Sequence, residues 1–367
     1  MRSPILTGTR PYGRPSGRLF VCAALLSLLT FLGAACGGGE DEEEAVSSPS
    51  PAERPVEKVT FMAGFKAQAN LPFVGVYVAQ EKGFFREQGL EVEVQHSDGS
   101  QHIQLLAAGR VQFATADAAQ VLRRRAEDPV LPLLAIALIG QTGQQGWVSL
   151  ADSGINEPKD WVGKTVGFRN TIPPDFYAIL QANGVDPAGV NTVNIQFQPP
   201  QLLVEGRVDV YPVFLSNEPD TIRRKLGREV NVFRAADYGV PTLGLTYITS
   251  EDFAAEKPDV VERFLKAALR GIEYAIDNRE EAVQIVLKFA PQEEAEHQRF
   301  MMDTEIDGAT STVTEANGLG WQTVEQWQAL EDSLRSFGAL ARPVDVSTVF
   351  TDRFLKRLYK DGELVWP

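Results

Sequence analysis

Two side-chain amides stand between two aromatic rings in residues 65–73, directly after the first predicted strand. Phe65 and Phe73 offer flat apolar faces, and Gln68 and Asn70 offer hydrogen-bond donors and acceptors. Such a loop suits the recognition of an uncharged planar heterocycle. The alternative is that either phenylalanine belongs to the hydrophobic core.

A second polar pair, Asn217 and Glu218, directly follows a later predicted strand. A carboxylate accepts hydrogen bonds from amino or imide groups and repels sulfonate or phosphate, so Glu218 in a pocket would disfavour an anionic ligand. Arg169, after another strand, would instead attract an anion or bind a carbonyl group. The alternative for Glu218 is a solvated carboxylate that caps the helix beginning near Pro219.

The composition excludes several classes of function. The chain has 367 residues, of which 44% are hydrophobic and 23% charged, as in folded globular proteins. Its net charge of −14 would repel nucleic-acid phosphates, so no nucleic-acid partner is expected. Both cysteines, Cys22 and Cys36, lie near the N-terminus, which leaves no thiolate chemistry for the rest of the chain. His96, His102 and His297 show no ligand spacing, and neither a metal nor a cofactor is predicted.

Residues 1–35 have the pattern of a signal peptide, because arginines without acidic residues precede an apolar run at residues 19–32. The small residues before Cys36 resemble the bacterial lipoprotein cleavage box, in which the new N-terminal cysteine is lipidated. Residues 36–56 are rich in acidic residues, serine and proline, and predict a disordered tether. We therefore expect a protein anchored by lipid on Cys36 at the extracytoplasmic side of the cell membrane. An ordinary secretory signal is the alternative.

Short β-branched runs alternate with helical periods from Val59 onward, which predicts an α/β protein with largely parallel strands. The pattern of residues 104–114 recurs at residues 201–211, with Gln, Leu, Leu, Gly, Arg and Val in register. In each copy a strand precedes a helix that Gly109 or Gly206 ends. Two similar α/β lobes are therefore expected.

Individual elements follow from the same periodicities. Strands are predicted at residues 59–62, 90–95 and 193–197, and a helix at residues 74–87. Residues 258–276 place their apolar side chains on one helical face, which must pack onto a lobe that is already formed.

The chain should cross between the lobes near residues 140–150 and 243–249. Lobe 1 is then expected to comprise residues 57–149 and 247–367, and lobe 2 residues 150–246. A ligand cleft should lie between them, at the carboxyl ends of strands.

Further candidates at strand ends or crossings that should face this cleft are Thr115, Asp117, Thr171, Asp175 and Tyr238. The first two occupy the equivalent place, in the first copy of the repeat, to Asn217 and Glu218 in the second. The threonines and aspartates could instead cap the helices that follow them.

The chain resembles the periplasmic-binding-protein superfamily, in particular the branch of alkanesulfonate-, thiamine-pyrimidine- and riboflavin-binding proteins of ABC importers. The resemblance is carried by residues 75–85, 107–114, 154–167, 214–219 and 241–247. It implies a type II-like fold with two hinge crossovers, a small-molecule ligand, and an ABC permease with its ATPase as partners. A monomer is the default for such proteins.

The resemblance also bears on the ligand. In the thiamine-pyrimidine relatives the first loop has an aromatic residue followed by Pro-Asn-x-Asn-His, whereas residues 65–73 lack the Pro-Asn pair and the histidine. Asn217-Glu218-Pro219 resembles a stretch whose Glu bonds the ring amine in those relatives. Riboflavin is therefore slightly preferred over a thiamine pyrimidine precursor, hydroxymethylpyrimidine or formylaminopyrimidine. An alkanesulfonate, nitrate or taurine ligand comes third.

Two other functional classes stay open. The same fold hosts a fungal pyrimidine synthase, but its cysteine-rich motif has no counterpart after Cys36, so no enzymatic activity is expected. A sensor module that presents its ligand-bound form to a receptor would carry no local motif.

Overall fold

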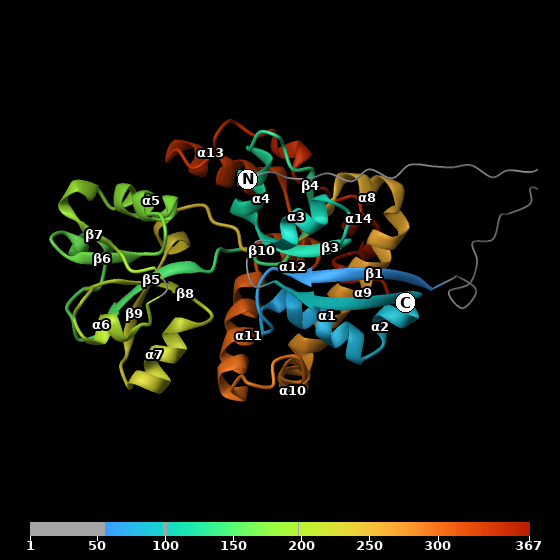
Figure 1. Ribbon diagram of the computed structural model, residues 1–367, viewed down its shortest axis with the longest axis horizontal. Helices are drawn as coiled ribbons and strands as arrows, with labels where there is room; N and C mark the ends of the chain where they lie inside the picture. Colours follow the sequence, from blue (N-terminus) through green and yellow to red (C-terminus); the bar gives the residue numbers. More distant parts are fainter. Residues whose placement is uncertain (1–55, 98–100, 197) are drawn as a thin grey trace, which may run out of the picture. The chain divides into compact units, whose positions relative to one another are not determined.

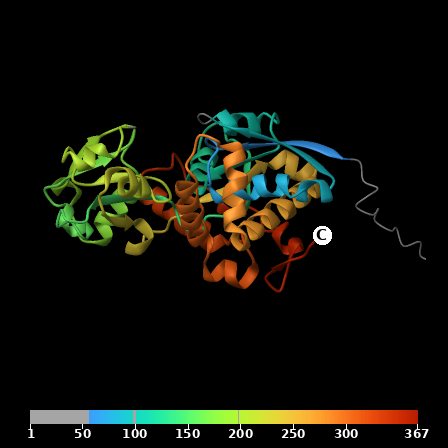
Figure 2. The same ribbon diagram turned by 90° about the horizontal axis from the view of Figure 1, so that it is seen from below.

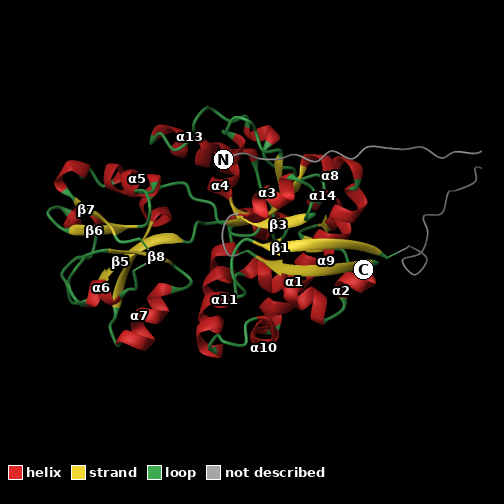
Figure 3. Ribbon diagram, viewed as in Figure 1, coloured by secondary structure: helices red, strands yellow, loops and turns green. Residues whose placement is uncertain are grey.

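The computed structural model describes residues 56–97, 101–196 and 198–367, which belong to one compact unit (Figure 1). The predicted signal peptide, Cys36 and the tether lie outside the described residues, apart from Val56. Strands and helices alternate through the first two thirds of this unit, and helices dominate the last third, as Figure 3 shows.

The larger sheet has the strand order β2-β1-β3-β10-β4. Its strands are β1 (Glu57–Ala63), β2 (Leu90–His96), β3 (Phe113–Asp117), β4 (Leu133–Leu138) and β10 (Leu245–Ser250). β1 pairs in parallel with β2 and β3, whereas β10 runs antiparallel to β3 and β4. The chain therefore leaves this sheet after β4 and returns to it with β10.

Helices cover both faces of the larger sheet (Figure 1). One face carries α1 (Leu71–Glu81), α2 (Phe84–Glu87), α9 (Pro258–Asp277), α10 (Arg279–Phe289) and α11 (Ala295–Ala309). The other face carries α3 (Gln101–Ala107), α4 (Ala118–Arg125) and α13 (Val324–Ser336). Figure 2 shows the first layer from below, with the orange α10 against the blue α1. Each layer buries its own apolar cluster against the sheet.

The remaining short elements complete the C-terminal third. They are α8 (Glu251–Glu256), α12 (Thr312–Asn317), α14 (Leu355–Leu358), β11 (Tyr359–Lys360) and β12 (Glu363–Leu364).

The amphipathic helix predicted for residues 258–276 is confirmed as α9, whose apolar face is buried. It crosses α1 at Gly271, where an added β-carbon would come within 2.0 Å of the carbonyl oxygen of Gly75. Glycine at position 271 thus permits the two backbones to pack in direct contact.

The single helix predicted for residues 74–87 is instead two helices, α1 and α2. Gly83 between them has a φ of 82°, a left-handed conformation that ends the first helix. α1 also begins earlier than predicted, at Leu71, because Pro72 fits the first helical turn, where its missing N–H is not needed.

A second group of strands forms two small sheets. β5 (Gln145–Leu150) pairs antiparallel with β8 (Tyr211–Phe214) and β9 (Val230–Arg234), and β6 (Thr165–Phe168) pairs in parallel with β7 (Asn191–Asn194). Helices α5 (Pro174–Ala182), α6 (Gln201–Val204) and α7 (Glu218–Leu226) pack beside them. Their core is centred on the buried Trp147, Trp161, Phe176 and Phe233.

The sequence repeat corresponds to a repeated local geometry. Gly109 and Gly206 have φ values of 68° and 66°, and each follows a short helix. The next residues, Arg110 and Arg207, each donate their N–H to a carbonyl five residues back, at 2.8 Å in both copies. The strand predicted for residues 193–197 is found at residues 191–194. Gln196, with a φ of 51°, lies outside the extended conformation of a strand.

The two connections between the sheets lie side by side. Gly244 donates its N–H to the carbonyl of Gly140 at 2.8 Å, and an added β-carbon on Gly244 would lie 2.7 Å from the carbonyl oxygen of Thr142. β5 pairs with the second group of strands, although the sequence-based division at residue 150 assigned it to lobe 1. The sequence alternation cannot show which sheet an isolated strand joins, because pairing depends on partners far along the chain.

Candidate functional site

A cavity of about 440 Å³ lies between residues of the larger sheet and residues of the second strand group. Nine of the candidates selected from the sequence line it: Phe65, Gln68, Asn70, Phe73, Thr115, Asp117, Arg169, Asn217 and Glu218. Its size falls in the range of small-molecule sites, which is about 300–1,000 Å³.

Three of the selected residues are placed elsewhere. Asp175 lines an adjoining cavity of about 290 Å³ that shares Asp117 and Gln120 with the first. Thr171 is exposed, and Tyr238 packs against the Trp161 core of the second group. The sequence placed Thr171 and Tyr238 near the cleft only through their distance from predicted strands, which does not determine the direction of a side chain.

The two phenylalanines of the first loop play different roles. Phe73 is buried in the apolar core that α1 forms with the larger sheet, and it also lines the cavity. Phe65 is 52% exposed, although it is a large apolar side chain. An exposed aromatic ring at the edge of a cavity is available to a ligand, whereas a core ring is already packed.

The amides of this loop are held by a residue that the sequence did not indicate. Asn70 donates its Nδ2 to Glu305 on α11 at 2.7 Å and accepts from Gln68 Nε2 at 2.6 Å. Glu305 also accepts from Ser216 Oγ at 3.1 Å and from the N–H of Leu71 at 3.3 Å. Because the Glu305 oxygen accepts from Asn70 Nδ2, the Asn70 oxygen is turned toward Gln68, so Glu305 fixes the orientation of both amides.

The Glu305 carboxyl is buried, and burial raises its pKa to about 7, while the hydrogen bonds from Asn70, Leu71 and Ser216 oppose that rise. No sequence signal could have indicated it. Residue 305 comes next to residue 70 only through the packing of α11 on α1.

On the opposite side of the cavity, Arg169 and Glu218 form an ion pair with an N···O distance of 2.5 Å. The second oxygen of Glu218 accepts the N–H of Phe214 at 2.7 Å, so this carboxylate does not cap its own helix. Burial alone would lower the pKa of Arg169, but the Glu218 charge and the hydrogen bonds that Arg169 donates to Tyr211 and Glu218 raise it. Arg169 Nη2 lies 3.5 Å from the Tyr211 hydroxyl.

This pairing changes what Arg169 offers to a ligand. Its charge is balanced by Glu218, so the cavity does not present an unpaired cation to an anion. Its Nε is buried without a hydrogen-bond partner among the described residues. A buried donor of this kind gains from a ligand acceptor.

Thr115 and Asp117 line the cavity, and their side chains also accept hydrogen bonds from backbone N–H groups. The Thr115 hydroxyl accepts the N–H of Gly64 at 2.9 Å, and Asp117 caps α4 by accepting the N–H of Ala119 at 3.0 Å. Burial raises the pKa of Asp117 to about 6, and Asp175 reaches about 6 for the same reason; the charge of Arg123 lowers both. The helix-capping alternative thus holds for Asp117, which also lines the cavity.

Several lining residues were missed from the sequence, including His102, Gln120, Gln198, Tyr211 and Phe214. One signal was available for Gln120. The repeat offset that aligns residues 104 and 201 aligns Asn217 with Gln120, and not with Thr115 or Asp117 as expected above; Gln120 and Asn217 both line the cavity.

Within residues 56–97, 101–196 and 198–367, no group of three or more His, Cys, Asp or Glu side chains is placed to hold a metal ion. In the same part of the chain, no helix combines the length and apolar character that a membrane span requires.

The arrangement of two strand groups joined by paired crossovers, with a cavity between them, is that of periplasmic binding proteins. The aliphatic sulphonate binding protein SsuA of Escherichia coli superposes with a TM-score of 0.62, at 14% identity over 80% of this chain and 91% of its own. The predicted α/β periplasmic-binding-protein fold is confirmed.

The chain belongs to the NMT1/THI5-like family, which its residues 70–282 match. It is 28% identical to the riboflavin-binding protein RibY of Chloroflexus aurantiacus, over 84% of this chain and 89% of that protein. It is 29% identical to a formylaminopyrimidine-binding protein of Halalkalibacterium halodurans, over 75% and 84%. A 4-amino-5-hydroxymethyl-2-methylpyrimidine phosphate synthase of Legionella pneumophila is 22% identical, over 76% and 87%. The predicted resemblance to this branch is confirmed.

Proposed function

We propose that the protein is a solute-binding protein of an ABC importer and that its ligand is an uncharged planar heterocycle, with riboflavin preferred. The observation that carries this proposal is the composition of the cavity. An exposed aromatic ring, Phe65, stands at its edge, side-chain amides line it on both sides, and its ion pair of Arg169 and Glu218 is internally balanced. Such a cavity offers stacking and directional hydrogen bonds without an unpaired positive charge.

Formylaminopyrimidine is the second candidate, because the relative from Halalkalibacterium halodurans is named for it. Glu218 would bond an amino group of the pyrimidine as readily as the imide of a flavin. The cavity volume and the exposed Phe65 favour the larger ring system of riboflavin. An anion such as a sulfonate is disfavoured because Glu218 neutralises Arg169.

We also propose where the protein acts and with which partners. A lipid on Cys36 and a tether over residues 36–56 would hold the folded unit near a permease and its cytoplasmic ATPase, outside the cytoplasm. The folded unit would act as a monomer that binds and releases its ligand unchanged, without enzymatic turnover.

The test is the purified protein, examined by ultraviolet-visible absorption and by thermal-shift titration with riboflavin, formylaminopyrimidine and an alkanesulfonate. A ligand that binds only the folded state raises the melting temperature by mass action. We expect riboflavin to do so, and Phe65→Ala to weaken its binding about tenfold through lost stacking. Thr171→Ala, an exposed residue outside the cavity, is the control and should bind as the wild type does. Absence of any shift with riboflavin, together with a shift for the pyrimidine, would transfer the proposal to the second ligand.

A further inference from the structure

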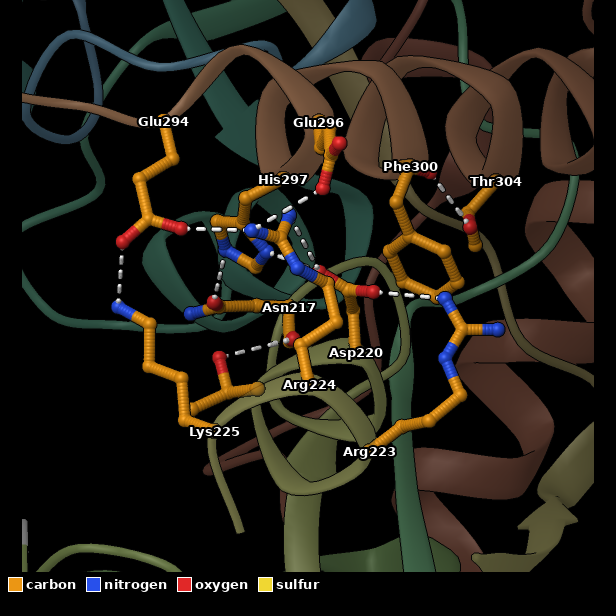
Figure 4. Close-up of polar contacts among 11 residues, drawn as sticks. Asn217, Asp220, Arg223, Arg224, Lys225, Glu294, Glu296, His297, Phe300 and Thr304 are labelled. Atoms are coloured by element: carbon orange, nitrogen blue, oxygen red, sulfur yellow. Dashed lines mark hydrogen bonds and ion pairs between the residues drawn. The ribbon is translucent and has the colours of Figure 1, made fainter. Parts of the chain in front are cut away.

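Helix α11 contacts helix α7 through a polar cluster next to the cavity (Figure 4). At its centre the imidazole of His297 lies between two residues of the α7 segment. Its Nε2 is 2.9 Å from Oδ1 of Asn217, and its Nδ1 is 2.8 Å from Oδ2 of Asp220. Asn217 also lines the cavity, so His297 touches a residue of the candidate binding site from outside.

Asn217 does not use its side chain as its position would suggest. It is the N-cap residue of α7, where an asparagine oxygen usually accepts a backbone N–H of the first turn. Here the side chain makes no capping hydrogen bond, and its oxygen points at His297. Figure 4 shows the amide nitrogen turned away from the imidazole. The orientation of this amide is therefore set by another helix.

The imidazole has an oxygen at each of its two nitrogens. A doubly protonated ring can donate to both oxygens, whereas a neutral ring carries one N–H and one acceptor nitrogen. Asp220 is buried and its carboxylate accepts, so the neutral ring keeps its proton on Nδ1. Its Nε2 then needs a donor, which Asn217 supplies only if its amide turns over.

Other charged groups surround His297 without touching its ring nitrogens. From α7, Arg224 pairs with Glu294 at 2.7 Å and with Glu296 at 3.4 Å, and Lys225 pairs with Glu294 at 3.2 Å. Arg223 bonds Asp220 Oδ1 at 2.8 Å and lies over the ring of Phe300, and Arg224 Nη1 lies 3.7 Å from Asp220 Oδ2, the oxygen that faces His297. Further along α11, Asp303 pairs with Arg279 of α10, and Arg299 pairs with Glu280 of α10. Asp220 is thus the charge in direct contact with the ring.

We propose that His297 is a positioning residue for ligand recognition, and that its protonation decides which end of the Asn217 amide faces the cavity. The proposal rests on the proposed function, because it concerns recognition in the same cavity. With the ring doubly protonated, Asn217 offers N–H donors, which match the carbonyl and ring-nitrogen acceptors of riboflavin. With the ring neutral, Asn217 offers its carbonyl oxygen, which does not match them.

The first test needs no ligand. In the full-length protein, the side-chain NH2 signals of Asn217, assigned with Asn217→Asp, are followed by nuclear magnetic resonance between pH 5 and 8. We expect them to change together with the ring signals of His297, and to lose that change in His297→Gln. Asn217 signals that stay constant between pH 5 and 8 would overturn the proposal.

The second test measures riboflavin affinity at pH 5.5 and pH 8. Glu305 and Asp117 also titrate near the cavity, so the comparison is between the wild type and His297→Gln. From pH 5.5 to pH 8, we expect riboflavin affinity to fall about tenfold more in the wild type than in His297→Gln. This difference corresponds to the loss of one hydrogen bond. Glu296→Gln, which alters only the exposed pair with Arg224, should keep the wild-type response.

The outcomes separate the two proposals. A wild type that binds riboflavin with the same pH response as His297→Gln overturns the role of His297 and leaves the proposed function intact. A wild type that does not bind riboflavin at either pH counts against the proposed ligand, and the resonance experiment then decides the role of His297. Melting curves of the ligand-free variant establish that it is folded.

Discussion

Asn70 and Glu305 are separated by 235 positions, yet the Asn70 amide donates to the Glu305 carboxylate at 2.7 Å inside the protein. The same oxygen of Glu305 accepts from Ser216, which belongs to the second strand group. One buried carboxylate thus links an amide of the cavity to the opposite side of the cleft. If the two strand groups move apart about their crossovers, as hinged binding proteins do, the bond to Ser216 must break.

Glu305 should make the stability of the protein depend on pH in a defined direction. Its pKa in the folded state is raised from the ordinary 4.5 to about 7, so the folded state binds the proton more tightly than the unfolded state. Its stabilising contribution is therefore complete below about pH 4.5 and is lost as the pH rises through 7.

The measurement is urea denaturation of the wild type and Glu305→Gln between pH 4.5 and 8. We expect the wild type to lose up to about 3 kcal/mol relative to the variant over this range. Asp117 and Asp175 titrate in both proteins, so their effects cancel in the difference. Parallel pH profiles for the two proteins would contradict the buried, protonated carboxyl.

Asp117 should stabilise α4 as its N-cap. Asp117→Ala removes the acceptor for the N–H of Ala119, whereas Asp117→Asn retains an acceptor oxygen. We expect the alanine variant to be about 1 kcal/mol less stable than the asparagine variant at pH 8. Burial raises the pKa of Asp117 to about 6 in the folded protein. At pH 8 the ionised carboxylate is therefore less stable in the folded than in the unfolded state, and the asparagine variant should be at least as stable as the wild type. Equal midpoints of denaturation for the alanine and asparagine variants would exclude the capping role.

The Arg169–Glu218 pair should show a measurable coupling energy. A double-mutant cycle with Arg169→Met and Glu218→Gln isolates their interaction, and we expect about 1–3 kcal/mol because both side chains are largely buried. The exposed pair Lys58–Glu91 is a matched control, for which the coupling should stay below about 1 kcal/mol. A coupling for Arg169–Glu218 as small as that of the control would mean that the pair is solvated and open to an anionic ligand.

The sequence predicted the fold and many of the residues that line the cavity, but not which of them bond to one another. Glu218 and Arg169 were both selected, because each follows a strand, but their pairing was not foreseen. Glu305 and His297 contact the lining residues Asn70 and Asn217 from α11, a helix whose own periodicity gives no sign of a site. Local patterns indicate where a strand ends, whereas the partners of a buried polar group depend on the packing of distant elements.

The crossing of α1 and α9 provides a sharp test of the packing. Gly271→Ala would place a methyl group 2.0 Å from the carbonyl oxygen of Gly75, an atom of another helix backbone that cannot turn aside. We expect a loss of about 3 kcal/mol or more in the free energy of unfolding, as for overpacked cores.

Gly308→Ala, in α11, is the matched control. Its methyl group would approach Gln144 Nε2, at the end of a flexible side chain, and alanine also favours the helix by up to about 1 kcal/mol. Denaturation midpoints of the two variants should therefore differ widely, with only Gly271→Ala far below the wild type; similar midpoints would show that the two helices separate easily at this crossing.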